Sequence, residues 1–260
     1  MRVNRLVGAG VAIVLSGSLL APAAAASPSA SDAPSAAQVS EPAAKKKAKL
    51  PKCRVDDDLT RYRKLNHWRR SMLDHEVRLP SVYVPKDLVP VSRAKVGGSG
   101  KVRKIIVKNL RAMGKDARAA GAAFSVRSAY RSYATQKATF AYWRSKLGYT
   151  AALRTSARAG HSEHQLGTTI DLRAAGSTTS DFGAFARTKS GRWVAKHAWK
   201  YGFVMSYPEG KTSKTCYKYE PWHFRYVGKK TAKAVRKSGL TLREYLWREY
   251  YKPKKEKSRS

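Results

Sequence analysis

The chain has 260 residues, of which 42% are apolar and 10% aromatic, so it can bury a hydrophobic core and is not disordered throughout. Its 53 Lys and Arg residues against 17 Asp and Glu give a formal net charge of +36. A charge of this size indicates an anionic partner and does not by itself say which one.

The first 26 residues have the pattern of a cleaved signal peptide. Arg2 and Arg5 precede an apolar run from Leu6 to Leu20, and small residues follow at 24–26. The alternative is a membrane anchor, but the run is interrupted by serines and is shorter than the roughly 20 apolar residues that span a bilayer. We therefore expect residues 1–26 to be removed. No later segment is apolar enough to span a membrane, so we expect the product to be secreted or associated with the cell wall.

Removal of two arginines and no acid would leave a net charge of +34. An exported protein meets anionic cell-wall polymers and lipid head groups before it meets nucleic acid. The sequence has no nucleic-acid-binding motif, and its aromatic residues follow core periodicity and do not alternate with cations. We therefore expect anionic wall polymers, bound through the basic surface, and no specific nucleic acid.

Beyond the signal peptide the composition divides the chain into three parts. Residues 27–51 are rich in Ala, Ser, Pro and Lys and predict a flexible linker, and residues 251–260 predict a basic tail. The stretch 52–250 reads as one domain. Its two cysteines, Cys53 and Cys216, form a possible disulfide in an oxidising compartment, with two free buried thiols as the alternative.

Apolar periodicity predicts helices alternating irregularly with short strands. We predict helices over 106–120, 132–147 and 192–201 and strands over 122–126, 168–172, 203–206 and 222–227. A last helix should open with a capping box of Thr241 and Glu244. Along helix 132–147 one face carries Tyr133, Gln136, Phe140, Trp143 and Leu147, which we expect in the core. The fold class is therefore α+β, with a small antiparallel sheet flanked by helices.

Two segments place polar groups where a strand would normally carry apolar ones. In the segment G-H-S-E-H-Q-L-G-T-T-I-D, His164 lies in a turn and Asp171 falls on an apolar strand, where an aspartate needs a cationic partner. In Y-E-P-W-H-F-R-Y-V, Glu220 and His223 flank Pro221, and a bend there would turn both toward one cavity. Two imidazoles and one carboxylate from distant segments are typical of a catalytic zinc site with one position open.

Three motifs in this order resemble the VanY-type D-alanyl-D-alanine carboxypeptidase family, which comprises zinc D,D-peptidases of the LAS type. They are S-A-Y-R-S-Y-A-T-Q, S-E-H-Q-L-G-T-T-I-D and E-P-W-H-F-R-Y-V-G, and together they span residues 128–228. The family pattern is Ser-x-His, six residues, Asp and later Glu-x-x-His, which this chain matches at Ser162, His164, Asp171, Glu220 and His223. One departure is Thr169, where the family often has Ala; it leaves the ligand spacing unchanged.

The resemblance implies a Zn²⁺ cofactor held by His164, Asp171 and His223, a general base at Glu220 and a substrate-binding arginine at Arg131. The residue types agree, because zinc activates water, a nearby carboxylate can take its proton, and a guanidinium can stabilise an oxyanion or hold a carboxylate. Ser162 and Gln136 could hydrogen-bond substrate.

The implied function is a secreted zinc metallopeptidase that acts on peptidoglycan stem peptides, most simply as a D-alanyl-D-alanine carboxypeptidase. The alternatives are an L-alanyl-D-glutamate endopeptidase or a D,D-dipeptidase with the same site, and a non-catalytic wall-binding module. The presence of Glu220 disfavours the last, because a structural metal site needs no general base.

Overall fold

The computed structural model describes residues 49–251. The predicted signal peptide 1–26, nearly all of the linker 27–51 and all but the first residue of the tail 251–260 lie outside that range. Within it, no helix is both long and apolar enough to cross a membrane.

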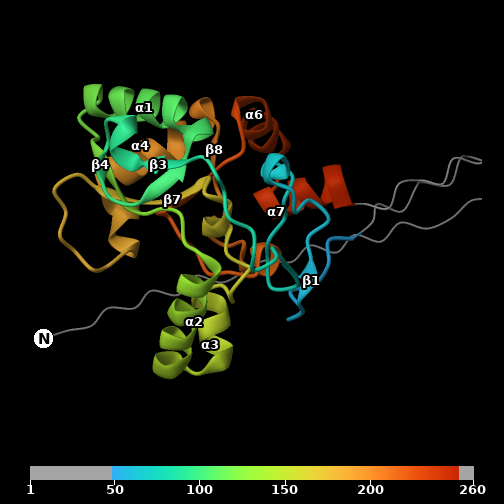
Figure 1. Ribbon diagram of the computed structural model, residues 1–260. Coiled ribbons are helices and arrows are strands. Elements are labelled where there is room, and N and C mark those ends of the chain that lie inside the picture. The colour runs from blue at the N-terminus through green and yellow to red at the C-terminus, as the bar shows by residue number, and fades with distance from the viewer. Residues whose placement is uncertain (1–48, 252–260) are drawn as a thin grey trace, which may run out of the picture. The chain divides into compact units, whose positions relative to one another are not determined.

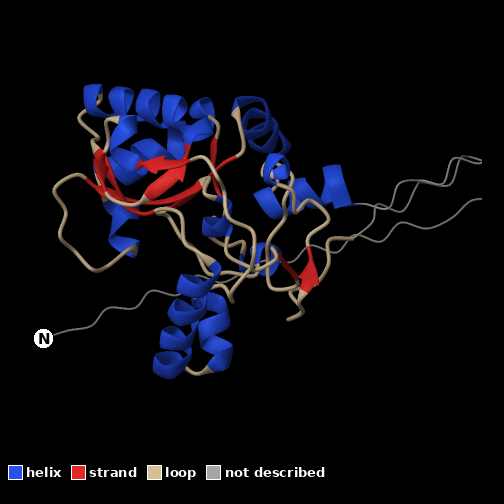
Figure 2. Cartoon of the chain, viewed as in Figure 1, coloured by secondary structure: helices blue, strands red, loops and turns tan. Residues whose placement is uncertain are grey.

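The central element is a sheet of five strands, confirming the predicted α+β class (Figure 2). Its strands, in spatial order, are β4 (Gly97–Gly98), β6 (Phe124–Ser128), β7 (Thr169–Ala174), β9 (His223–Tyr226) and β8 (Phe203–Met205). The pair β4 and β6 is parallel and the other three pairings are antiparallel. Two smaller pairs lie outside this sheet, β1 (Asp58–Leu59) with β2 (Val77–Arg78) and β3 (Leu88–Pro90) with β5 (Lys101–Arg103).

Side-chain alternation gives the sheet two chemically different faces. On β7, Ile170 and Leu172 point into the main hydrophobic core, so Asp171 between them must point to the opposite face. On that core side, α1 (Lys104–Ala119) buries Ile106 and Leu110 against the sheet (Figure 1). The sheet therefore presents its polar strand residues away from α1.

Other helical elements pack beside α1 or belong to the C-terminal part of the chain. They are α4 (Lys189–His197), the 3₁₀ turn η5 (Ala198–Tyr201), α6 (Lys229–Ser238) and α7 (Leu242–Leu246). The predicted helices 106–120 and 192–201 correspond to α1 and to α4 followed by η5, and the capping box of Thr241 and Glu244 is present. Short 3₁₀ turns η1 (Leu65–His67), η2 (Val91–Ala94) and η4 (Gly183–Arg187), helix α5 (Thr212–Thr215) and the π-turn η6 (Trp247–Tyr251) fill the connections.

The expectation that the aromatic face of helix 132–147 joins the core is wrong. The helix is α2 (Tyr133–Leu147), and it forms a hairpin with α3 (Tyr149–Thr155) on the side of the sheet away from α1 (Figure 1). Only Gln136 in α2 is fully buried; Trp143 is half-buried and Leu147 is exposed. The physical reason is that this face of α2 meets α3 and the cavity and not the main core: Phe140 contacts Tyr149 of α3, and Trp143 lines the cavity described below.

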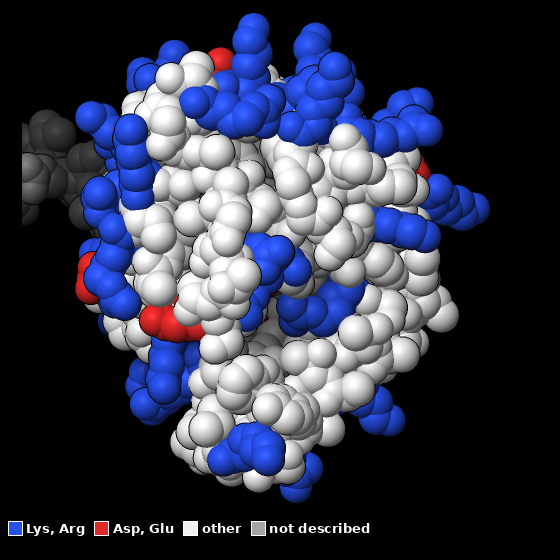
Figure 3. All heavy atoms as spheres, turned by 90° about the vertical axis from the view of Figure 1, so that its left-hand side faces the viewer, with Lys and Arg blue, Asp and Glu red and all other residues white. Residues whose placement is uncertain are grey.

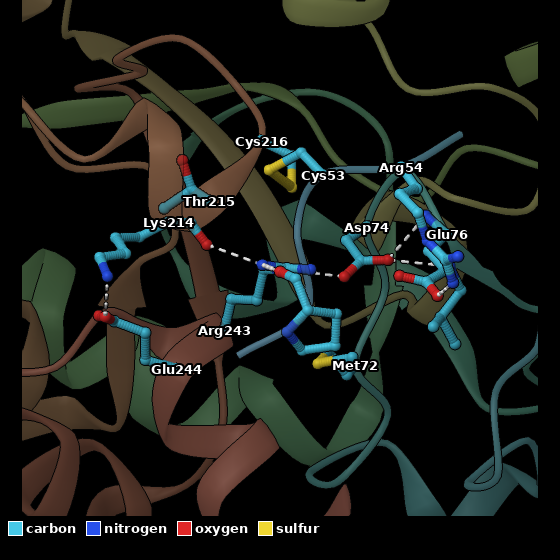
Figure 4. Close-up of polar contacts among 12 residues, drawn as sticks. Cys53, Arg54, Met72, Asp74, Glu76, Lys214, Thr215, Cys216, Arg243 and Glu244 are labelled. Carbon is cyan, nitrogen blue, oxygen red and sulfur yellow. Dashed lines mark hydrogen bonds and ion pairs between the residues drawn. A yellow bond between two sulfur atoms is a disulfide. The ribbon is translucent and has the colours of Figure 1, made fainter. Parts of the chain in front are cut away.

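A disulfide and a cluster of polar contacts attach residues 53–76 to residues 214–244 (Figure 4). Cys53 and Cys216 form a disulfide. Arg243 donates from Nε to Asp74 Oδ2 at 2.6 Å and from Nη1 to the carbonyl of Lys214 at 3.1 Å. Both members of this ion pair are buried, and the cluster fixes the segment that leads from Cys216 to the cavity described below.

Candidate active site and metal centre

Three predicted ligands, His164, Asp171 and His223, come together on the polar face of the sheet. One donor atom from each lies within 4.8 Å of the others, and all three side chains are buried. Asp171 and His223 are directly paired across β7 and β9, so their side chains share one face. His164 reaches them from the 3₁₀ turn η3 (Glu163–Leu166), which ends in Gly167 with a positive φ of 70°.

The orientation of His164 is fixed by the backbone. Its Nδ1 donates to the carbonyl of Ala129 at 2.7 Å, which leaves Nε2 as the lone-pair nitrogen, 3.1 Å from Asp171 Oδ2. Ser162 caps η3, because its Oγ accepts from the His164 backbone N at 3.3 Å. Ser162 also lines the cavity, and its hydroxyl proton is available to a ligand there.

His223 lies between two carboxylates. Its Nε2 donates to Glu163 Oε2 at 3.0 Å, and its Nδ1 lies 3.1 Å from Asp171 Oδ1. Burial lowers the pKa of His223, but Asp171 and Glu163 outweigh burial and raise it to about 10. The two carboxylates therefore favour positive charge at His223.

The residues present fit a zinc ion. Two imidazole nitrogens and a carboxylate oxygen are the donors that zinc takes in three-ligand catalytic sites. Asp171 Oδ1 is buried, and the nearby donor described for it is His223 Nδ1 at 3.1 Å, in a geometry that does not meet hydrogen-bond criteria, as expected for two atoms directed at one cation. Ala129 fixes the tautomer of His164, and Glu163 fixes that of His223. Once His223 Nδ1 loses its proton, each imidazole directs an unprotonated nitrogen toward the same point.

Glu220 lies at the edge of this cluster, just before β9. Its Oε2 is 3.4 Å from His223 Nδ1, and its side chain is 15% exposed to the cavity. Burial raises the pKa of Glu220 to about 8, against the opposing effect of His223. A carboxyl group with such a pKa can take up and release a proton near neutral pH.

Arg131 is held beside the ligands by several contacts. It donates from Nη1 to Gln136 Oε1 at 2.8 Å and from Nη2 to Ser128 Oγ at 3.0 Å, and its Nη2 is 3.9 Å from Asp171 Oδ2. Gln136 is fully buried, and its amide nitrogen donates to Ala157 O at 2.6 Å. The geometry of Gln136 therefore favours positioning Arg131 over contacting substrate.

These groups line a cavity of about 480 Å³, which is the size of a site for a short peptide. Its walls also include Trp143 of α2 and Phe182, so the aromatic residue that we expected in the core faces the cavity. Arg131 is the only Lys or Arg among the lining residues of the described chain. The cavity thus combines a metal-ligand cluster, the carboxyl groups of Glu220 and Asp181 and one guanidinium.

Sequence reasoning missed Glu163, which connects the ligands to the interior. Glu163 accepts from His223, from Ser206 Oγ at 2.6 Å and from Arg225 Nη1 at 2.8 Å. Burial raises its pKa, but Arg225, His223 and Ser206 lower it to about 2. A signal was present: Arg225 follows His223 by two on a predicted strand, so it shares the buried face and needs a counter-charge.

Comparison with known proteins agrees with this arrangement. A family model described as VanY, D-alanyl-D-alanine carboxypeptidase, matches residues 99–229. The Bacillus subtilis (strain 168) protein YodJ is 37% identical over 181 residues, which are 68% of this chain and 66% of YodJ. The chain therefore spans slightly under two thirds of the length of that relative.

Two solved structures are similar over most of their own length. The LdcB LD-carboxypeptidase has a TM-score of 0.64 at 34% identity, covering 73% of this chain and 94% of LdcB. A variant of the vancomycin resistance D,D-pentapeptidase VanY in complex with Zn(II) has a TM-score of 0.57 at 30% identity, covering 69% of this chain and 99% of that one.

Proposed function

Because this chain belongs to the VanY family of D-alanyl-D-alanine carboxypeptidases, we propose that it is a zinc peptidase that removes the terminal D-alanine from peptidoglycan stem peptides. The observation that carries the proposal is the buried cluster of His164, Asp171 and His223, with Glu220 and Arg131 beside it in one cavity. His164, Asp171 and His223 would hold the zinc ion.

Zinc in this position supplies Lewis acidity, which brings the pKa of water from about 15.7 towards 7. Glu220 takes the proton that the attacking water loses, on its Oε2, and then delivers it to the leaving amine. Its raised pKa suits the second half of this transfer, because a carboxyl group of ordinary pKa would be a poor acid at neutral pH.

Arg131 donates to the carbonyl oxygen that gains negative charge or to the terminal carboxylate of the peptide. Both roles need a fixed guanidinium, and the contacts with Gln136 and Ser128 provide it. A cavity with a single cation favours a substrate with few negative charges near the scissile bond, as in a D-Ala-D-Ala terminus.

A second candidate is removal of a single D-alanine from a tetrapeptide stem, as an LD-carboxypeptidase. It is supported by the similarity to LdcB, whose TM-score exceeds that of the VanY structure. The D,D-dipeptidase and L-alanyl-D-glutamate endopeptidase alternatives share the same ligands and are distinguished by product.

Mass spectrometry on defined substrates separates these activities. Zinc-loaded protein is incubated with a pentapeptide ending in D-Ala-D-Ala, a tetrapeptide ending in one D-Ala, and free D-Ala-D-Ala, beside Glu220→Ala. Loss of one alanine from the pentapeptide by the wild type alone is the expected result. Loss only from the tetrapeptide would replace the proposal with its alternative, and intact substrates with zinc bound would refute peptidase action on stem termini.

We further propose that the protein acts outside the cytoplasm. The sequence of residues 1–26 supports export, and the disulfide of Cys53 with Cys216 suits an oxidising compartment. The mature protein recovered from a producing culture should begin near residue 27 when its N-terminus is sequenced. Recovery of the uncleaved chain from the cytoplasm would contradict export.

A further inference from the structure

We propose that one face of the protein, formed by α1, η5 and α6, binds a linear phosphodiester polymer of the cell wall. The exposed cations of these elements, here called the basic face, are Lys104, Lys108, Arg111, Lys115, Arg118, Lys200, Lys229, Lys230, Lys233, Arg236 and Lys237. The choice of a wall polymer rests on the proposed function; the binding surface itself rests on the structure.

The cations of α1 form a regular row. They recur at steps of four, three, four and three from Lys104 to Arg118, so they share one side of the helix. The opposite side of the helix carries buried residues such as Ile106 and Met113. At 1.5 Å per residue the row is about 21 Å long, which suits an extended chain of repeated anions better than a single small ion.

The row on α1 continues across neighbouring elements. The turn η5 contacts both α1 and α6 and carries the exposed Lys200. In Figure 3 the Lys and Arg side chains crowd the upper part of the molecule, which is the side of α1 in Figure 1, and further ones lie along the left edge and at the centre of this face. The lower part, where the α2 and α3 hairpin lies, shows far fewer.

The charge of this face is not neutralised within the described chain. Across α1, η5 and α6 the only acid is Asp116, and its Oδ2 accepts a hydrogen bond from the Tyr201 hydroxyl at 2.5 Å. Among residues 49–251, none of the eleven cations lies within 4.0 Å of a carboxylate. Arg111 and Arg118 donate to backbone carbonyls, which holds them along the surface. Such an uncompensated field binds a polyanion.

The kind of polyanion follows from what the face lacks. Of the large hydrophobic side chains that are exposed in the described chain, Ile105 alone lies in α1, η5 or α6. The basic face therefore has no fully exposed aromatic side chain. Single-stranded nucleic acid normally stacks its bases on exposed aromatics, and a membrane-surface helix inserts a broad apolar face. A hydrated polymer that offers only phosphates needs neither feature.

The α1 part of the basic face and the cavity lie on opposite sides of the sheet. Ile170 and Leu172 point toward α1, whereas Asp171 between them points into the cavity. A polymer bound along α1 therefore leaves the cavity open to a stem peptide. The basic face would hold the enzyme on the wall while its active site works on the peptides.

Binding of the mature, disulfide-intact protein to purified Bacillus subtilis walls tests the proposal, using walls with and without their phosphodiester polymer. The key variant is Lys104→Gln/Lys108→Gln/Lys115→Gln. Its matched control is Lys137→Gln/Lys146→Gln/Lys218→Gln, which removes the same charge around the α2 and α3 hairpin, where all three lysines are exposed. Hydrolysis of a soluble pentapeptide is measured for every variant.

We expect the α1 variant to bind complete walls at least tenfold more weakly at low salt, with a salt dependence shallower by about two to three ions. The control variant should lose less than threefold, and stripped walls should bind wild type weakly. Equal losses in both variants, full binding to stripped walls, or tighter binding to phosphatidylglycerol vesicles or double-stranded DNA would each overturn the proposal. Pentapeptide hydrolysis reports separately on the proposed function and should be unchanged in the α1 variant.

Discussion

Glu163→Gln is the sharpest test of how the fold supports the metal ligands. The substitution keeps the shape of the side chain but removes the charge that faces His223 and Arg225. Arg225 is fully buried and then has no counter-charge, keeping the carbonyls of Trp68 and Ser71 and at most a neutral amide oxygen as partners. Loss of one partner of a buried ion pair costs about 3–5 kcal/mol, and loss of a carboxylate behind a metal-binding histidine lowers metal affinity about 10–100-fold.

The pKa of Glu163 gives an independent figure for the same interaction. A shift from 4.5 to about 2 corresponds to about 3 kcal/mol of folding free energy, in line with the cost of the broken pair. Because the pKa is depressed in the folded protein, this stability is present above pH 4.5 and disappears as the pH falls towards 2. In metal-free Glu163→Gln that part of the acid dependence should be missing.

Two measurements on each protein separate metal support from folding. Urea unfolding of the metal-free protein gives the stability, and competition with a chelator gives the zinc affinity. Ser206→Ala is the control, because it removes one hydrogen bond to Glu163 and keeps the charge, at an expected cost of about 1 kcal/mol. Wild-type zinc affinity in a destabilised Glu163→Gln would refute the role in metal binding and leave Glu163 as a partner of Arg225 alone.

Other predictions follow from single contacts. Gln136→Leu should lower kcat about 10–100-fold in peptide assays while chelator competition shows unchanged zinc affinity, because it frees Arg131 to leave its position; an unchanged kcat would contradict this. Cys53→Ser/Cys216→Ser should lower the free energy of unfolding by up to about 5 kcal/mol, since the disulfide closes a 163-residue separation; unfolding curves that coincide would refute it. Trp143→Ala should raise KM several-fold with a stability loss under about 1 kcal/mol, because this side chain lines the cavity outside the core; a large stability loss with normal KM would contradict that placement.

The sequence predicted those parts of the site that conflict with their local surroundings. Asp171 interrupts an apolar strand, and the segment around His223 mixes polar groups with strand-forming aromatics, so both could be recognised before any contact was known. The family resemblance added their roles. The strand pairing that brings Asp171 beside His223 depends on register, which the local sequence pattern does not specify without the partner strand.

Features that conflict with nothing locally were missed or misjudged. Glu163 follows a helix-capping serine and precedes a histidine, a context that is equally natural for a solvent-exposed turn. The aromatic face of α2 has the periodicity of a core helix, but periodicity describes only one partner in a contact. The partner of α2 is α3 and not the sheet core, and Trp143 lies on the wall of the cavity.

Side-chain alternation in β7 explains how the proposed catalysis and the proposed wall binding can be separated in one small domain. In β7, Ile170 and Leu172 attach the strand to α1, and Asp171 attaches it to the metal ligands. A change on the outer side of α1 reaches the cavity through the buried contacts that α1 makes with the sheet and its neighbours, which close packing holds in place. Charge substitutions on the basic face should therefore alter where the enzyme binds without altering kcat on a soluble peptide.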